Sequence, residues 1–191
     1  TLRDLLAEDP GEVRALQRLI RLDLAAGDWA DIEGYLDAWL EREPDNVAAT
    51  ALLVRYLNAR DRLDEARAHL EERLRAQPTQ PQLYADFASI LAMRRERTAL
   101  ADLAARAAAE GRDGNPAVLD VAVAIALDLG EPAQALALVE DRLERTPDDV
   151  GALLTRARVH YLRDDVAAAR ADLARVRGLE PANAVAANSL V

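Results

Sequence analysis

The residues of this chain that could carry out metal or nucleophilic chemistry are few and widely separated. The two histidines, His69 and His160, lie in different repeat units, and neither sits in a metal-ligand spacing. The chain has no cysteine, so it has no thiolate metal site, no thiol nucleophile and no disulfide. Each histidine is therefore interpreted as a partly exposed helical side chain.

Two pairs of adjacent acids, Asp148–Asp149 and Asp164–Asp165, could in principle act as general acid and base. Both pairs come directly before a predicted helix, where a carboxylate accepts hydrogen bonds from free N–H groups and faces the positive end of the helix dipole. We therefore predict that they cap helices. The cluster "RRER" at 94–97 could contact an anion, but it is short and contains an acid, which favours a solvated turn.

Glycines occur singly at turns, and no stretch resembles a loop that cradles phosphates. The sequence therefore predicts no catalytic residue, no cofactor-binding residue and no metal ligand, and we do not expect an enzyme. The formal net charge of −10 disfavours nucleic acid and anionic membrane surfaces as partners. The longest apolar run, "VAVAIAL" at 121–127, is far shorter than the roughly 20 residues that span a bilayer, so we expect no direct membrane insertion.

Proline positions reveal an internal repeat. Pro10, Pro44 and Pro78 follow one another every 34 residues, and Pro147 and Pro181 keep the same interval. The distance from Pro78 to Pro147 is 69 residues, so one unit between them carries a one-residue insertion. Turn-forming stretches lie halfway through the units, at 26–29, 59–62, 129–132 and 163–166. A period of this length is typical of helical repeat proteins.

The residues between these turns follow helical spacing. Alanine, leucine, arginine and glutamate dominate them, and all four are strong helix formers. Each second helix has a small or apolar residue at one repeated position and another four residues later; the pairs are Ile32/Leu36, Ala66/Leu70, Leu100/Ala104, Ala135/Val139 and Ala169/Leu173. Each unit is therefore predicted to be a helix, a short turn, a second helix and a turn marked by proline.

These units resemble the tetratricopeptide repeat (TPR). "LDEARAHLEERLRAQP" and "GEPAQALALVEDRLERTP" match the second helix of that motif, and "GALLTRARVHYLRDDVAAARADLARVRGLEP" matches a whole unit. The resemblance implies an all-α, right-handed α-solenoid of about five helix-turn-helix units with partial repeats at both ends. Some positions where the family prefers a small residue depart from its pattern: Ile20, Val54 and Val123 in first helices, and Trp39, Arg73, Arg142 and Val176 in second helices.

In this register one solenoid domain covers 1–191, with units at about 13–46, 47–80, 81–115, 116–149 and 150–183. The stretches 1–9 and 184–191 are interpreted as partial helices, so we expect the chain to be a fragment of a longer array. The third unit carries the inserted residue, next to the turn formers of 111–116. That segment is either a hinge between two halves of the chain or an ordinary, slightly longer loop.

The resemblance also implies where a partner would bind, because first helices line the concave surface of such arrays. One inward column holds Arg21, Arg55, Ser89, Ala124 and Arg158. Neighbouring columns add Arg14, Gln17, Asn58, Gln82, Asp120, Leu127, Asp128, Leu154 and Tyr161. Of the positions at which chaperone-tail binders of the family clamp a carboxylate, only Arg21 keeps the expected charge, so that function is not supported.

The predicted function is a protein–protein interaction scaffold that holds a peptide, a helix or a partner domain in this groove, with an acidic partner favoured by the arginines. One alternative is a structural spacer or self-associating segment of a bacterial envelope or polysaccharide-export assembly, and another is the regulatory domain of a larger enzyme. The lack of cysteine fits cytoplasm and periplasm equally, and no signal peptide is visible, so the compartment stays open.

Overall fold

The computed structural model describes residues 1–9, 11–26 and 31–182, and these residues form eleven α-helices and no strand. The helices are α1 (Leu2–Glu8), α2 (Val13–Ala26), α3 (Ile32–Arg42), α4 (Val47–Ala59), α5 (Leu63–Ala76), α6 (Pro81–Met93), α7 (Arg97–Asp113), α8 (Pro116–Asp128), α9 (Pro132–Arg145), α10 (Val150–Leu162) and α11 (Val166–Leu179). The predicted all-α class is confirmed. The partial helix predicted at 184–191 lies outside the described residues, as does most of the turn predicted at 26–29.

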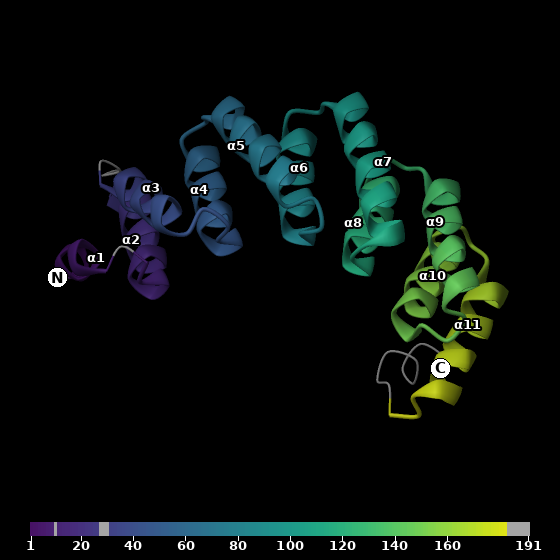
Figure 1. The fold of residues 1–191 in the computed structure, drawn as a ribbon. Coiled ribbons are helices and arrows are strands. Elements are labelled where there is room, and N and C mark those ends of the chain that lie inside the picture. The colour runs from purple at the N-terminus through teal and green to yellow at the C-terminus, as the bar shows by residue number, and fades with distance from the viewer. Residues whose placement is uncertain (10, 27–30, 183–191) are drawn as a thin grey trace. The chain divides into compact units, whose positions relative to one another are not determined.

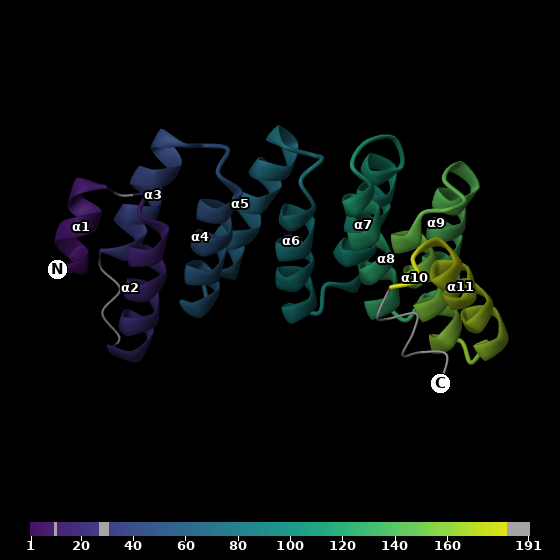
Figure 2. The ribbon, with the colours of Figure 1, turned by 90° about the horizontal axis from the view of Figure 1, so that it is seen from below.

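Contacts between Cα atoms divide the chain into two compact units, Thr1–Arg95 and Glu96–Val191, here called unit 1 and unit 2. Within each unit, every helix packs against the next one along the chain, and α4 also packs against α6. In unit 1, the first helices α2, α4 and α6 share one face, while the second helices α3 and α5 lie behind them (Figures 1 and 2). This surface of α2, α4 and α6 is called the first-helix face below.

The repeated apolar positions of the second helices form the contact between helices. All ten of these side chains are at most 8% exposed: Ile32, Leu36, Ala66, Leu70, Leu100, Ala104, Ala135, Val139, Ala169 and Leu173. A helix that presents a small residue at such a position lets the neighbouring first helix approach closely, and burying its leucines supplies the hydrophobic free energy. The buried core residues therefore recur at the same interval as the sequence repeat.

One turn geometry recurs between the two helices of a repeat. Its central residue lies in the left-handed region at Asp61 (φ 59°), Arg95 (φ 57°), Gly130 (φ 77°) and Asp164 (φ 61°). In three of the four turns a backbone N–H bonds to a carbonyl five residues earlier, as Arg62 does to Leu57 at 2.9 Å. This is the Schellman pattern that ends a helix sharply, and only Gly130 adopts it without a steric cost. The recurrence identifies Arg95 as the central turn residue of the irregular third unit.

The segment 111–116, for which the sequence left a hinge and an ordinary loop open, joins two closely packed helices. Gly111 is buried in the last turns of α7, and a Cβ at this position would lie 2.8 Å from both Cα and Cβ of Leu119 in α8. Asn115 caps α8 by accepting a hydrogen bond from the Ala117 N–H at 3.0 Å. Glycine is therefore required here for close approach between the helices, which favours the ordinary loop.

Gly111→Ala should destabilise unit 2 even though alanine is the better helix former. The added methyl group meets the backbone of α8, which cannot rotate away, so the helices must separate at a cost of about 1–3 kcal/mol. Urea unfolding followed by circular dichroism measures this change.

Gly34→Ala is the matched control, since Gly34 lies inside α3 with no atom near its missing Cβ. It should stabilise the protein by roughly 0.5–1 kcal/mol through helix propensity alone. Equal effects of the two substitutions would contradict the close α7–α8 contact.

Candidate functional site

Arginine is the only basic residue of this chain besides the two histidines, and in unit 1 the arginines of the first and second helices differ in their contacts. In unit 1, every arginine of the second helices is paired with a carboxylate. Arg42 contacts Asp9, Arg67 and Arg75 contact Glu71, and Arg73 contacts Asp45 at 2.6 Å; in α1, likewise, Arg3 contacts Asp31. Three of these pairs, Arg3–Asp31, Arg42–Asp9 and Arg73–Asp45, join residues about one repeat apart, so these guanidinium groups connect successive repeats.

The first helices of unit 1 behave differently. Their arginines, Arg14, Arg18 and Arg21 on α2 and Arg55 on α4, are all exposed, and none forms an ion pair with an acid in the described part of the chain. Asp23, the nearest candidate by sequence, is buried at 7% exposure and forms no ion pair with them. The first-helix face of unit 1 therefore presents guanidinium groups that form no ion pair with a described carboxylate.

The eleven side chains with polar groups among those predicted to line the groove lie on first helices and are exposed, whereas Leu127 and Leu154 from the same prediction are half-buried. Seven lie on unit 1 and four on unit 2: Arg14, Gln17 and Arg21 on α2, Arg55 and Asn58 on α4, Gln82 and Ser89 on α6, Asp120 and Asp128 on α8, and Arg158 and Tyr161 on α10. That they bind a partner stays a prediction.

Asp120, one of these eleven, is already engaged within the molecule. Arg142 of α9 donates to its Oδ1 at 2.7 Å and also contacts Asp149 at 2.7 Å. Asp149 in turn caps α10 by accepting from the Ala152 N–H at 2.9 Å. Burial opposes ionisation of Asp149, but these hydrogen bonds prevail and lower its pKa. Arg142 thus joins α8, α9 and α10 from a position where the family pattern has a small residue.

On α6, the polar side chains mostly contact their own helix. Gln82 donates to Oδ1 of Asp86 at 2.9 Å, and the Ser89 hydroxyl donates to the carbonyl of Ala85 at 3.0 Å. Burial raises the pKa of Asp86, while the Gln82 hydrogen bond and the positive charge of Arg55 act in the opposite direction. Arg55 of α4 therefore lies close enough to α6 to stabilise a carboxylate on it.

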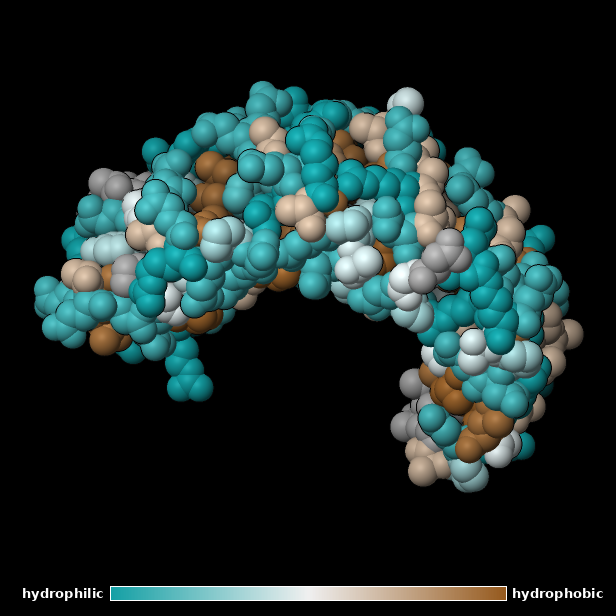
Figure 3. All heavy atoms as spheres, in the orientation of Figure 1, coloured by the Kyte–Doolittle hydropathy of each residue, from teal (hydrophilic) through white to brown (hydrophobic). Residues whose placement is uncertain are grey.

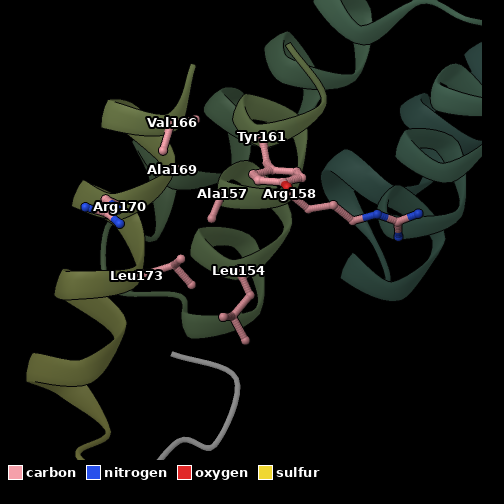
Figure 4. Close-up of a pocket in the computed structure, with 8 residues that line it drawn as sticks. All are labelled: Leu154, Ala157, Arg158, Tyr161, Val166, Ala169, Arg170 and Leu173. Carbon is pink, nitrogen blue, oxygen red and sulfur yellow. The ribbon is translucent and has the colours of Figure 1, made fainter. Parts of the chain in front are cut away.

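Unit 2 contains a pocket of about 470 Å³ between α10 and α11. Figure 4 shows Leu154, Ala157, Ala169 and Leu173 between the two helices, with Arg158 and Arg170 on opposite sides. Tyr161 and Val166 complete the rim and are 68% and 48% exposed. The pocket unites three residues predicted from the sequence, Leu154, Arg158 and Tyr161, with four from α11. Those four were missed because only first helices were expected to line a binding surface.

The other residues considered for chemistry have structural surroundings. Asp149 and Asp165 accept helix-capping hydrogen bonds from Ala152 and Ala168, which confirms the predicted role for one acid of each pair. The other two acids do not cap: Asp148 pairs with Arg175, and Asp164 is the central residue of a turn. His160 lies 3.8 Å from Asp165, and burial lowers the pKa of His69. No group of His, Cys, Asp and Glu in the described ranges could hold a metal ion, and none of their helices is long and apolar enough to cross a membrane.

Known proteins share this arrangement. A family model for the tetratricopeptide repeat matches residues 23–89. This match covers about a third of the chain and lies within unit 1. No curated protein sequence matches it. Solved structures do: PilW, a type IV pilus biogenesis factor, has a TM-score of 0.57 at 16% identity, covering 100% of this chain and 88% of that one. YrrB, a TPR protein with an unusual peptide-binding site, has a TM-score of 0.53 at 14% identity, covering 99% and 97%.

A thermophilic TPR protein from Thermus thermophilus is also similar, with a TM-score of 0.54 at 16% identity over 93% of this chain and 98% of that one. Similarity at these identities establishes the fold, and the predicted class, a solenoid of TPR-like helix pairs, is confirmed at that level. The tetratricopeptide fold is in general a non-enzymatic scaffold for protein–protein interaction.

Arg142→Ala should destabilise unit 2, because the side chain is only 17% exposed and its removal leaves Asp149 without its cation. We expect a loss of about 1–3 kcal/mol at neutral pH in denaturant unfolding. The pKa of Asp149 is lowered in the folded state, so the contribution of this pair is present above about pH 4 and is lost as the pH falls further.

Arg177→Ala removes the same charge from an exposed site of α11 and should change stability by less than about 0.5 kcal/mol. If the two variants have equal stability at pH 7, or if Arg142→Ala keeps the acid dependence of the wild type, the proposed tie is absent.

Proposed function

We propose that this tetratricopeptide-repeat chain is a docking scaffold that binds an acidic peptide segment of another protein on the first-helix face of unit 1. The observation that carries the proposal is the division of the arginines. Those of the second helices of unit 1 contact carboxylates, whereas Arg14, Arg18, Arg21 and Arg55 are exposed with no ion pair to a described acid.

The spacing of these arginines suits an extended ligand. Arg14, Arg18 and Arg21 follow one another at four and three residues on α2, so they share one stripe of that helix. Arg21 and Arg55 occupy the same position of successive repeats and are 34 residues apart. Guanidinium groups present planar pairs of donors that match carboxylates, and a row of them favours an acidic segment over a neutral one.

The net charge of −10 adds to the selectivity expected of this face. An acidic protein repels acidic partners over most of its surface. A local cluster of arginines without ion pairs attracts an acidic segment, so such a segment should bind at this face and not elsewhere. Asn58, Gln82 and Ser89 supply neutral hydrogen-bonding groups on the same face for the backbone of the ligand. The similar YrrB structure is described as having a peptide-binding site, which supports a peptide as the ligand class.

The test is a peptide array probed with the wild type and with Arg21→Ala/Arg55→Ala. We expect acidic peptides to bind in a salt-sensitive manner, and the double variant to bind them roughly tenfold more weakly, since each exposed pair contributes up to about 1 kcal/mol. Both side chains are exposed, so the variant should keep its helical circular dichroism and melting temperature.

Arg67→Ala/Arg75→Ala is the matched control, because it removes two charges from α5, on the opposite side of unit 1. It should bind the acidic peptides like the wild type. Binding of neutral peptides only, or equal losses in both double variants, would refute the proposal.

A further inference from the structure

We propose that unit 1 has a second interaction site, a pocket between its second helices that takes an arginine side chain from a partner protein. The pocket has a volume of about 370 Å³ and is formed by α3, α5, the turn after α3 and one residue of α4. It is called the α3–α5 pocket below. None of its residues belongs to the predicted groove, so this site does not depend on the proposed function.

The acids of α3 and α5 differ according to whether they line this pocket. Four acids outside it form ion pairs with arginines: Glu33 and Glu65 with Arg62, Asp64 with Arg94, and Glu71 with Arg67. The three acids that line it, Asp37, Glu41 and Glu72, are exposed and form no ion pair or hydrogen bond with any described residue. The pocket therefore gathers the acids of these two helices that lack a cation in the described part of the chain.

The arginine in the pocket wall already has a partner. Arg73 contacts Asp45 at 2.6 Å, and its side chain is only 12% exposed. Burial, and then the charges of Glu33 and Glu41, raise the pKa of Asp37. A cation placed among these carboxylates would offset their repulsion and favour their ionised forms. The ligand group expected here is therefore positively charged.

The apolar part of the pocket suits the stem of a long cationic side chain. Leu40, Pro44 and Leu53 line it, and Leu53 is only 7% exposed. Figure 3 shows a few hydrophobic side chains between the hydrophilic ones that cover unit 1. The methylene groups of arginine can pack on such residues while the charged end reaches the acids.

His69 adds a hydrogen-bonding group to the pocket wall without adding charge. Burial lowers its pKa, so the ring is neutral at pH 7. Its Nε2 atom is buried and has no hydrogen-bond partner in the described ranges. A neutral imidazole has one acceptor nitrogen, to which a guanidinium N–H can donate.

A guanidinium group fits carboxylates on two helices better than an ammonium group does. Its five N–H donors lie in one plane and can bond to several acceptors at once. Arg62 shows this arrangement one helical turn before Asp37: it donates to Glu33 of α3 at 2.6 and 2.7 Å and to Glu65 of α5 at 2.7 Å. We therefore expect the pocket to prefer arginine to lysine.

Unit 2 has its own arginine at the equivalent place. Three pairs of residues occupy the same positions three repeats apart: Asp37 and Glu140, Leu53 and Arg156, and His69 and Asp172. Arg156 donates to Oδ1 of Asp172 at 2.6 Å, and this bond, followed by the charge of Glu140, raises the pKa of Arg156 against the effect of burial. Unit 1 has a leucine and a histidine at these two positions, so the cation for its acids has to come from a ligand.

The probe is Nα-acetyl-arginine N-methylamide, which imitates one arginine residue within a peptide. The citrulline derivative is its neutral counterpart, and the lysine derivative is its ammonium counterpart. Because the 191-residue chain has only two histidines, the imidazole signals of His69 in ¹⁵N NMR report binding at the pocket, and those of His160 are the internal control. We expect the arginine derivative to shift the His69 signals alone and to bind roughly fivefold more tightly than either counterpart.

Asp37→Asn/Glu72→Gln should bind the arginine derivative roughly fivefold more weakly than the wild type, and it should keep its helical circular dichroism because both side chains are exposed. The matched control is Asp64→Asn/Glu71→Gln, which removes the same charge from α5 outside the pocket and should leave binding unchanged. Equal losses in the two variants would show long-range attraction only and would overturn the proposal.

Leu53→Arg/His69→Asp copies the unit 2 arrangement into unit 1. The new arginine should occupy the pocket, so saturation-transfer NMR should detect no binding of the arginine derivative to this variant. A folded variant that still binds the derivative would place the site elsewhere. The exposed acids Asp37 and Glu72 test the pocket independently of how stable this variant is.

Three further results would reject the inference. Equal binding of the citrulline or lysine derivative would exclude recognition of arginine. If agmatine, which has a guanidinium group but no peptide groups, binds more tightly than the arginine derivative, the pocket takes a small-molecule cation. If the wild type forms dimers in sedimentation that Asp37→Asn/Glu72→Gln dissociates, the occupant is a second copy of this chain. The peptide array described above reports on Arg21 and Arg55 and not on this pocket, so either proposal can fail alone.

Discussion

The contact between a first helix and the preceding helix pair is the interaction on which the whole fold depends. A single helix of this chain cannot bury its apolar stripe alone, and each pair still leaves a seam that only the next helix fills. Ala66 and Ala135 are fully buried in these seams, and the larger Leu70 and Val139, one turn later, complete them. Because each helix pair leaves such a seam, stability is a sum over neighbours.

In unit 1, the arginines of the second helices form ion pairs with carboxylates, and those of the first helices do not. Second helices use arginine to hold neighbouring segments together, as Arg73 does with Asp45 and Arg142 with Asp120 and Asp149. In unit 1, the arginines of the first helices do not connect neighbouring segments in this way. Exposed ion pairs contribute little stability singly, so an uncompensated guanidinium costs the fold little and remains available to a partner.

The sequence alone predicted the repeat period, the helix pairs and the buried repeated positions of the second helices. The proline interval and the apolar spacing can be read from the sequence without knowledge of which helices pack together. It also predicted the capping role of Asp149 and Asp165. It did not predict that Arg142 would reach Asp120, since that contact depends on the distance between three packed helices. It missed Val166 and Arg170 as pocket residues, because whether a seam is open or covered depends on which helix packs beside it in space.

The binding role of unit 1 depends on the arginines of the first-helix face being unengaged while those of the second helices are engaged. Arginine Nε–Hε signals in ¹⁵N NMR report this difference directly, and the absence of lysine simplifies the spectrum. We expect slow hydrogen exchange and restricted guanidinium rotation for Arg73 of α5 and Arg142 of α9, whose carboxylate contacts are 2.6 and 2.7 Å long. Arg21 and Arg55 should show fast exchange and free rotation. Equal protection of both groups, or protection of Arg21 and Arg55 alone, would contradict the division.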